Sequence, residues 1–598
     1  MTTITVKSTK KVNFILAISS DNVIGANCQI PWKIKEDLNH FKSLTTYDKN
    51  TTHNKWLEEN NIKIDPVFKK PSLTSNMIIM GFKTFESIGS RPLPNRLNVV
   101  LTSKYEEMIN KENLVFLSNI SNALYYGNIA PNIKTIWIIG GKQLFESIND
   151  IQPDNVYLTR INMTFPHITD KIQISDSFFQ YLETSYETSY ETSYENFTNH
   201  DSVEDNSFFD DFSEDDLCFN NTKSICKDLI SDTDVEVEFI TYYKKNNNLL
   251  QNQISSSDFI SYDVCPSVRP EKQYLNLLKN VIYLGEFRQT RNDFTWSDFG
   301  SQLEFDMIYG FPLLTSKKVP LKIIFEELMF FIRGYTDNKI LKEKNIHIWD
   351  SNTTSDFIES NNKKYSNSDK FLETDDMGPM YGFQWRYFNT NYDRISNASN
   401  TAYYKSNSKN DQLQKIINEL QTDPFSRRII MTTFNPEQVS NGVLYPCHSI
   451  VIQFYAKTDQ NNPNNLLLSI KMYQRSADLF LGLPFNIAST ALFLYLICDH
   501  LNQLNQQNQQ NQQNQQKQTK SYTYEPSKVI ITLGDTHIYQ SHLNAVLTQL
   551  QANIYNFPNL TIKQDSDSPI MSIESYEWSN IELSDYKADK IIKAKMIA

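Results

Sequence analysis

The chain has few cysteines, no excess of positive charge and no long apolar run. Its 598 residues include six cysteines, which form no Cys-x-x-Cys pair. This usage argues against a structural zinc site, predicts no metal and indicates a reducing compartment. The formal net charge of −12 and the isoelectric point of about 5.4 argue against a general nucleic-acid binder. An anionic substrate would therefore need local clusters of lysine and arginine.

Apolar stretches are short near both ends of the chain. Lys7, Lys10 and Lys11 precede only the run Val12–Ile18, which is shorter than a signal peptide requires. The later run Ala491–Cys498 is too short to span a bilayer. We therefore expect no membrane partner and a cytoplasmic location.

The first third of the chain begins with a predicted buried strand and a helix that carries an acid. Val12–Ile18 has the continuous apolar character of a buried strand. Asp37 follows Trp32 by five residues, near the start of the next predicted helix. A carboxylate there is favoured by the helix dipole. It would also be favoured by a ligand that offers paired N–H donors, since its burial alone is costly. The residues leave both interpretations open.

Three predicted strands in this third end in groups that suit a phosphate. Gly81 follows the first of these strands, Ser103 and Lys104 follow the second, and Gly140-Gly141 follow the third. A glycine between strand and helix lets the helix N-terminus approach a phosphate. Each turn alone is common, but three in order predict a nucleotide cofactor bound across the strand ends of an α/β sheet.

A cysteine in the second half of the chain lies close in sequence to several arginines. Cys447 stands between a proline and a histidine, with Arg427-Arg428 upstream and Arg475 downstream. Most intracellular cysteines are inert core residues. Guanidinium groups, however, stabilise a thiolate and can also hold a phosphate. This stretch therefore predicts a nucleophilic thiolate next to an anion-binding pocket.

The chain from about Glu271 to Ala598 resembles thymidylate synthase. The matching strings are Phe311–Thr315, Gly378–Gly382, Ser426–Ile429, Leu444–His448, Tyr473–Asp478, Leu483–Ser489 and Gly534–Tyr539. The resemblance implies transfer of a one-carbon unit from methylene-tetrahydrofolate to dUMP, with Cys447 as nucleophile, Glu327 as proton relay and Tyr381 assisting proton removal. It implies dUMP contacts from Arg291, Arg427, Arg428, Gln474, Arg475, Ser476, Asp478, Asn486, His537 and Tyr539. It implies folate contacts from Trp349, Asp478 and Ala598.

Roughly residues 12 to 245 resemble dihydrofolate reductase. The matching strings are Ile24-Gly25, Pro31-Trp32, Met80–Gly89, Arg91–Arg96, Ile139–Gly141 and Tyr157–Thr159, together with Asp37. The resemblance implies that Asp37 binds the pterin with support from Thr159, that Phe41 contacts the folate, and that Arg96 holds its glutamate carboxylate. It implies NADPH contacts from Ala17, Gly25, Lys83, Thr84, Ser103, Lys104, Gly140 and Gly141.

Both resemblances together are those of the bifunctional dihydrofolate reductase–thymidylate synthase family. They imply an α/β fold: a doubly wound, mostly parallel sheet, then a larger α+β domain. We place the reductase at 1–245 with insertions near 47–72 and 183–232, a linker at 246–270, and the synthase at 271–598. A low-complexity tract at 502–518 is expected as a surface loop after the helix Thr490–His500. The family implies a homodimer through the synthase, with Arg427-Arg428 reaching across the interface, and no obligatory nucleic acid.

Two departures from the family patterns keep alternatives open. The phosphate loop reads Arg291–Thr295 without the usual glycines, and Phe145 stands where the reductases usually have tyrosine. One alternative is an enzyme with one impaired half, in particular the synthase. Another is a regulatory RNA-binding protein that kept the fold, although the acidic charge and the lack of a basic–aromatic stripe count against it. The residues that favour an enzyme are Cys447, Glu327, Asn486, His537 and Asp37.

Overall fold

The computed structural model describes residues 10–27, 29–46, 75–111, 113–130, 132–188, 222–228, 233–244, 270–364, 372–392, 410–512, 522–563 and 572–597. The chain divides into two compact units, Met1–Phe259 and Ile260–Ala598. The predicted insertion at 47–72 lies outside the described residues, as do most of the one at 183–232 and nearly all of the linker. The predicted domain boundaries therefore stay predictions.

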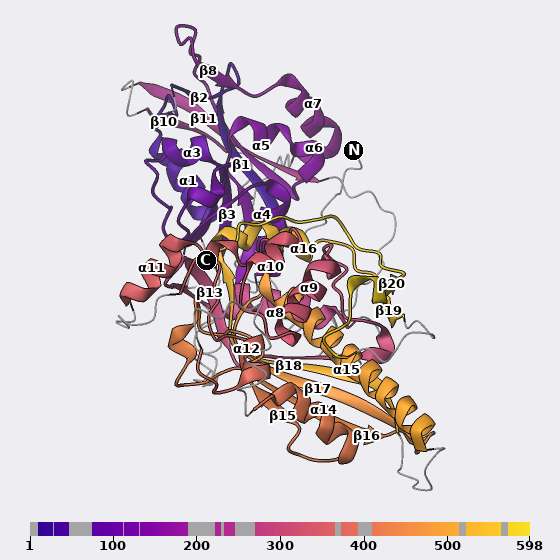
Figure 1. The fold of residues 1–598 in the computed structure, drawn as a ribbon. Helices are drawn as coiled ribbons and strands as arrows, with labels where there is room; N and C mark the ends of the chain where they lie inside the picture. Colours follow the sequence, from indigo (N-terminus) through magenta and orange to yellow (C-terminus); the bar gives the residue numbers. More distant parts are fainter. Residues whose placement is uncertain are drawn as a thin grey trace, which may run out of the picture. The chain divides into compact units, whose positions relative to one another are not determined.

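A mostly parallel sheet forms the centre of the first unit (Figure 1). Its parallel strands are β1 (Lys11–Ser19), β3 (Ser75–Gly81), β4 (Arg96–Leu101), β5 (Leu114–Leu117), β6 (Ile133–Ile138) and β7 (Asn155–Ile161). β11 (Asp234–Lys244) joins β7 antiparallel, and β10 (Thr222–Lys227) and β9 (Tyr186–Thr188) pair with β11. β2 (Val23–Ala26) and β8 (Lys171–Gln173) form a separate ribbon. The predicted mostly parallel α/β sheet is confirmed.

Helices cover both faces of this sheet, because side chains alternate along each strand. The helices are α1 (Lys35–Thr45), α3 (Phe82–Ser87), α4 (Ile120–Ile129), α5 (Lys142–Glu146), α6 (Ile148–Ile151) and α7 (Asp176–Ser185). On one face, α1 and α3 pack against a core cluster that contains Ile78 and Trp137. On the other, a Cβ on Gly127 of α4 would lie 2.5 Å from the Met77 side chain. Strand ends and helix starts therefore meet at one edge of the sheet.

The second unit contains a mixed sheet. Its strands are β12 (Glu286–Gln289), β13 (Phe294–Phe299), β18 (Thr523–Tyr539), β17 (Asn465–Asp478), β16 (Val451–Thr458) and β15 (Ile430–Thr432) in that spatial order, and β14 (Gln302–Asp306) also pairs with β18. β17 and β18 are parallel, and the other pairs are antiparallel. β19 (Asn559–Ile562) and β20 (Ile581–Ser584) form a separate antiparallel pair. The predicted α+β character is confirmed.

A long helix lies along β17 and β18 (Figure 1). The helices of this unit are α8 (Lys272–Leu284), α9 (Leu321–Ile332), α10 (Lys339–Glu343), α11 (Ser355–Lys364), α12 (Gly382–Tyr387), α14 (Gln412–Thr422), α15 (Gly482–Gln512) and α16 (Leu543–Leu550). Within the described ranges, α15 is the one helix whose length and apolar composition would suffice to cross a membrane. However, 72% of its apolar window is buried in the unit. This burial is that of a core helix.

The low-complexity tract differs from our expectation of a surface loop from 502 to 518. α15 continues through it to Gln512, since glutamine is a good helix former. Asn502 also pairs with the backbone of Tyr524: its Nδ2 donates to the carbonyl oxygen at 2.9 Å, and its Oδ1 accepts from the N–H at 2.7 Å. Asn505 donates to the Tyr522 carbonyl oxygen at 2.7 Å. The first part of the tract is therefore a docked helical extension, and 513–521 lies outside the described residues.

Candidate active sites

Cys447 lies in the turn that precedes β16, and hydrogen bonds fix its backbone. Its carbonyl oxygen accepts from the Arg475 N–H at 2.7 Å, and its own N–H donates to Tyr381 Oη at 3.2 Å. The same phenol oxygen lies 3.6 Å from Cys447 Sγ. The Arg475 guanidinium donates to the carbonyl oxygens of Tyr445 and Pro446, at 3.3 and 3.2 Å. The Cys447 thiol is half-buried. The Arg475 guanidinium holds the segment Tyr445-Pro446 that leads to it.

Tyr381 packs against two neighbouring rings. Its ring stacks on His448 at 4.5 Å and on Phe331 at 4.8 Å between centroids. Its φ of 34° lies in a region that L-residues rarely adopt. Strain of this kind persists only where the surroundings impose it. A Cβ on the next residue, Gly382, would lie 2.3 Å from the Phe331 carbonyl oxygen, so the chain passes too close for any other residue. This packing holds the phenol against Cys447.

Glu327 is a buried carboxyl group on α9. Its Oε1 accepts from Trp349 Nε1 at 2.9 Å. Burial raises the pKa of Glu327 to about 7, although the Trp349 hydrogen bond acts in the opposite direction. A carboxyl group that titrates near neutral pH can both accept and release protons.

The ends of β17 and the start of α15 bring further predicted residues together. Gln474 Nε2 donates to Asn486 Oδ1 at 3.0 Å, which fixes the orientation of the Asn486 amide. Ser476 lies two residues further along β17, where its N–H is 3.4 Å from the Cys447 carbonyl oxygen. At the end of the strand, Asp478 Oδ1 accepts from the two backbone N–H groups of residues 480 and 481, at 2.9 and 3.1 Å. The amide and the carboxylate are thus fixed before any ligand binds.

The neighbouring strand β18 contributes His537 and Tyr539. Asp478 and His537 are direct partners in the parallel register of β17 and β18. His537 Nδ1 lies 2.7 Å from Asp535 Oδ1, and its ring meets that of Tyr539 edge-on at 5.0 Å. Burial raises the pKa of Tyr539 to about 12, and the charges of Asp478 and Cys447 add to the effect. Both side chains therefore belong to the cluster around Cys447.

Some predicted anion ligands lie apart from this cluster. Arg291 is exposed, and its Nε donates to the adjacent Asn292 Oδ1 at 2.8 Å. Its charge nevertheless acts on Tyr539. Arg427 and Arg428 are exposed in the turn after α14, and neither side chain has a hydrogen-bond or ion-pair partner among the described residues. Ala598 lies outside the described residues.

In the first unit, Asp37 is directed to a residue of β7. Thr159, buried on β7, hydrogen-bonds the Asp37 side chain, and Ala17 of β1 is the direct strand partner of Thr159. Burial raises the pKa of Asp37 to about 6, and the Thr159 bond acts against this rise. Glu36, in the same helical turn, is exposed. The two acids of this turn therefore have different environments.

Arg96 lies at the opposite end of α1. Its Nη1 donates to Thr45 Oγ1 at 2.5 Å, and its Nε donates to the Pro94 carbonyl oxygen at 3.2 Å. The guanidinium carbon is 5.7 Å from the ring centre of Phe41. Asp37 and Phe41 thus lie on α1, and Arg96, the first residue of β4, contacts the end of this helix.

Two glycine turns meet at the ends of β3 and β6. The Gly81 N–H donates to the Gly140 carbonyl oxygen at 2.8 Å. A Cβ on Gly140 would lie 3.3 Å from the Phe145 ring, and one on Gly141 would lie 3.2 Å from Thr84 Oγ1. Such a turn lets a phosphate approach the backbone closely. The turn therefore fits a dinucleotide such as NADPH.

The other predicted NADPH ligands lie in two places, at neighbouring strand ends and on a separate ribbon. Lys83, Ser103 and Lys104 are exposed after β3 and β4. Gly25 lies on the separate β2–β8 ribbon, where an added Cβ would be 3.3 Å from the Gln29 carbonyl oxygen. The structure therefore brings the strand-end residues together and leaves Gly25 outside that group.

Sequence reasoning missed three side chains near the sites. His448 stacks on Tyr381, and burial lowers its pKa to about 4. Trp32 is buried with its Nε1 unpartnered among the described residues. His542 faces Asp478 with its Nδ1 3.8 Å from the carboxylate. The sequence did offer one signal for His542. It follows Tyr539 by three residues, which places it near the end of the same strand and close to the predicted site.

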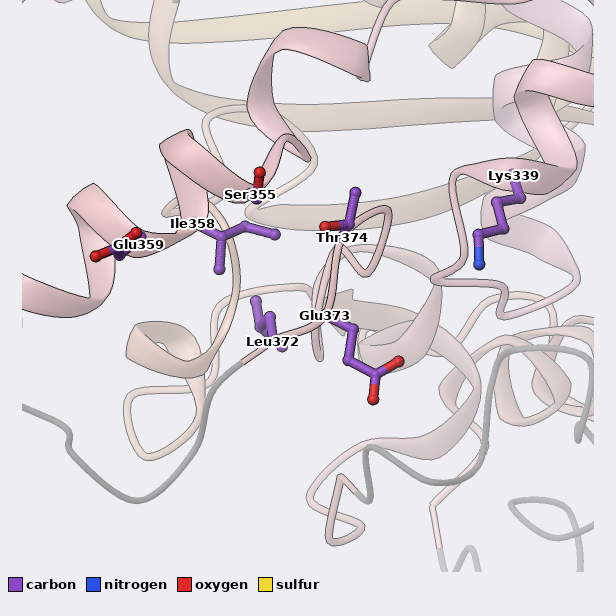
Figure 2. Close-up of a pocket in the computed structure, with 7 residues that line it drawn as sticks. All are labelled: Lys339, Ser355, Ile358, Glu359, Leu372, Glu373 and Thr374. Carbon is purple, nitrogen blue, oxygen red and sulfur yellow. The ribbon is translucent and has the colours of Figure 1, made fainter.

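A cavity of about 510 Å³ lies elsewhere in the second unit (Figure 2). Its lining residues are Lys339, Ser355, Ile358, Glu359, Leu372, Glu373 and Thr374. None of them belongs to the predicted sites. The cavity therefore shares no lining residue with the clusters around Cys447 and Asp37.

Comparisons with known proteins identify the family of the chain. The thymidylate synthase family model matches residues 272–511 and 518–598, and the dihydrofolate reductase family model matches residues 11–51 and 61–203. Three full-length relatives are bifunctional dihydrofolate reductase-thymidylate synthases. That of Plasmodium chabaudi is 31% identical over 96% of this chain and 94% of its own. The Zea mays protein is 32% identical over 97% of this chain and 96% of its own length. The Paramecium tetraurelia protein is 30% identical over 98% of this chain and 99% of its own length. The chain therefore belongs to the bifunctional dihydrofolate reductase–thymidylate synthase family.

Proposed function

We propose that the Cys447 and Asp37 clusters carry out the two reactions of this family. As a member, the chain reduces dihydrofolate to tetrahydrofolate with NADPH, and it converts dUMP to dTMP with methylene-tetrahydrofolate. The observation that carries the proposal for the second unit is the contact of Cys447 with Tyr381, near a carboxyl group that titrates close to neutral pH. Separate assays of both reactions on the purified chain test it.

In the second unit, Cys447 Sγ adds to carbon 6 of the uracil ring. The addition places an electron pair on carbon 5 and the carbonyl at carbon 4, and carbon 5 then attacks the one-carbon unit of the folate. Glu327 exchanges protons with the pyrimidine oxygen and the folate nitrogen through water. Burial raises the pKa of Tyr381 well above its usual range, so the phenol stays protonated. Tyr381 therefore assists removal of the carbon 5 proton by orienting the acceptor.

The remaining residues of this cluster hold the two substrates. Asn486, oriented by Gln474, binds the edge of the uracil ring. His537 and Tyr539 bind the ribose hydroxyl, and Arg475 and Ser476 bind the phosphate together with Arg291. Asp478 and Trp349 contact the folate. The fixed amide and carboxylate support this assignment, because preorganised polar groups bind without a reorganisation cost.

In the first unit, NADPH supplies a hydride when it is bound. The Gly140-Gly141 turn and Thr84 hold its phosphates, with Lys83, Ser103 and Lys104 at the neighbouring strand ends. Asp37 accepts hydrogen bonds from the pterin N–H groups and favours its protonated form. Arg96 holds the glutamate carboxylate beside Phe41. The hydrogen bond between Asp37 and Thr159 supports this arrangement.

A Trp349→Phe substitution tests the role of Glu327. It removes the hydrogen bond that lowers the pKa of Glu327, so this pKa should rise above its present value of about 7. The limb of the synthase pH–rate profile that reports Glu327 should therefore move to higher pH. An unchanged limb would exclude Glu327 as the titrating group, and the reductase profile of the same chain is the control.

We further propose a cytoplasmic homodimer, formed through the face of the second sheet that is opposite α15. Tyr455 and Ile430 on this face are 66% and 50% exposed, which is high for large apolar side chains on a sheet. A second copy would cover them, since a two-fold interface uses the same patch twice. It would also give the unpartnered Arg427 and Arg428 a phosphate to bind in the partner's site.

Mixing two inactive chains tests the shared site. An Arg427→Ala homodimer and a Cys447→Ala homodimer should each have little synthase activity. In a mixed dimer, one site collects both defects and the other collects neither. With random exchange of equal amounts, roughly a quarter of the wild-type activity should return.

The matched control pairs two residues of one chain's own site. Mixed dimers of Glu327→Gln and Cys447→Ala chains should regain no activity, because each of their two sites keeps one defect. If subunit exchange is verified and the Arg427→Ala mixture also stays inactive, the arginines act within their own chain.

A further inference from the structure

His542 joins the folate side of the synthase site to the C-terminal segment of the chain. It is fully buried at the start of α16. Its Nε2 lies 2.7 Å from the Lys595 carbonyl oxygen, and its Nδ1 lies 3.8 Å from Asp478 Oδ1. One imidazole therefore contacts both the carboxylate assigned to folate and the backbone of the last residues.

The C-terminal segment is held at successive points after β20. Tyr586 Oη donates to the Leu314 carbonyl oxygen at 2.8 Å and accepts from the Val319 N–H at 2.9 Å. The Asp589 N–H then donates to the Thr315 carbonyl oxygen at 2.8 Å. In the described part of the segment, Lys595 is the last residue whose backbone is held by a side chain, and that side chain is His542. The position of the final residues therefore depends on this histidine.

The two contacts of His542 differ in kind. The Lys595 carbonyl oxygen needs an N–H at Nε2, whereas Nδ1, 3.8 Å from Asp478, has no hydrogen-bond partner among the described residues and is held by charge alone. A neutral ring therefore loses the attraction to Asp478 that helps to hold the imidazole against Lys595. The other groups that face it are Tyr539 of β18, the Phe480 ring and the cation of Lys317, which donates to the Phe480 carbonyl oxygen.

The balance of these groups favours the charged ring. Burial lowers the pKa of His542, and the charge of Lys317 acts in the same direction. The carboxylate of Asp478, with the Lys595 carbonyl oxygen, outweighs both and raises the pKa above its ordinary value. The two-contact state is therefore complete at low pH and is lost as the pH rises through this raised pKa.

We propose that His542 is a positioning residue for methylene-tetrahydrofolate, which latches the C-terminal segment beside Asp478. The proposal rests on the assignment of Asp478 and the last residues to folate binding. Release of the latch frees the segment and opens the folate side of the site. Binding of the dUMP base by Asn486 and of its phosphate by Arg475 does not depend on it.

Trypsin provides a direct test of the latch. Trypsin cleaves after Lys595 by attacking the carbonyl group that His542 contacts. Cleavage at this bond therefore requires that the contact with His542 first break. In the wild-type chain, cleavage should be slow at low pH and become faster as the pH rises, relative to a free peptide of the same sequence. In His542→Gln it should be fast at every pH. His347→Gln is the matched control, because His347 also pairs with an aspartate, Asp350 at 2.8 Å, but is exposed.

Kinetics separate positioning from a merely structural role. His542→Gln should raise the KM for methylene-tetrahydrofolate about tenfold, the effect of one lost hydrogen bond to a charged group. The KM for dUMP and the reductase activity should not change. Equal rises in both synthase KM values, or unaltered cleavage after Lys595, would overturn the latch.

The proteolysis does not require turnover, which keeps the two proposals separate. A chain whose cleavage depends on pH and on His542, but whose methylene-tetrahydrofolate KM does not, retains the latch and refutes the folate assignment. If His542→Gln fails to bind dUMP and is therefore misfolded, the pH dependence of cleavage in the wild-type chain tests the latch instead. Cleavage that follows the free peptide at every pH would overturn the proposal without any variant.

Discussion

Replacement of Cys447 by alanine is expected to abolish dTMP formation and to leave dihydrofolate reduction intact. The alanine variant has no sulfur to add to carbon 6, so carbon 5 is not activated for attack on the folate. Loss of a nucleophile of this kind should lower the synthase turnover by at least roughly 10³-fold. Both reactions are measured on the same preparation, and the reductase rate is an internal check on the chain.

Another cysteine of the second unit, Cys498, provides the matched control. Cys498 is buried in α15, and burial raises the pKa of its thiol well above the usual range. Cys498→Ala should therefore cost some stability through a small cavity but keep synthase activity. The Cys447→Ala chain should still bind dUMP, which shows that its site is folded. Near-wild-type turnover by Cys447→Ala would remove Cys447 as the nucleophile.

The sequence was sufficient to predict the family, both activities and the main architecture, and these predictions are confirmed. Apolar strands such as Val12–Ile18 lie in the parallel sheet because both of their faces must be covered. The role of Asp37 stays a prediction, because the residues around it also fit a helix-dipole interpretation. The two glycine turns meet at the strand ends because parallel strands end at the same edge.

The contacts between distant segments were not predictable from the sequence. The Trp349–Glu327 hydrogen bond and the His542–Lys595 contact depend on how separate segments pack, which no local pattern encodes. The helical extension through the glutamine tract is a different kind of failure. Its composition suggested a loop, but helix propensity and the docking of Asn502 to the backbone of Tyr524 extend the helix. The dimer that would use the exposed Arg427 and Arg428 stays a prediction, because one chain alone does not test it.

Replacement of Asp37 by asparagine is expected to reduce the rate of hydride transfer strongly at pH 7. Positioned proton transfer contributes about 10²–10⁴-fold to catalysis, so a loss of this order should follow. The pKa of Asp37 is about 6, raised by burial, so the wild-type carboxylate is ionised at neutral pH and can pair with pterin N–H groups. The variant should recover part of its rate as the pH falls, because the substrate then arrives already protonated. Single-turnover rates as a function of pH measure this.

Glu36 makes this test specific, because it shares the first turn of α1 with Asp37 but is exposed. If Asp37 only complemented the helix dipole, Glu36→Gln and Asp37→Asn would have similar, small effects on stability and none on hydride transfer. If Asp37 binds the pterin, only Asp37→Asn should lower the rate, and the wild-type titration near pH 6 should disappear in that variant alone. Synthase activity should be the same in both chains. An Asp37→Asn chain with an unchanged rate at pH 7 would leave the helix-dipole interpretation as the better account of this residue.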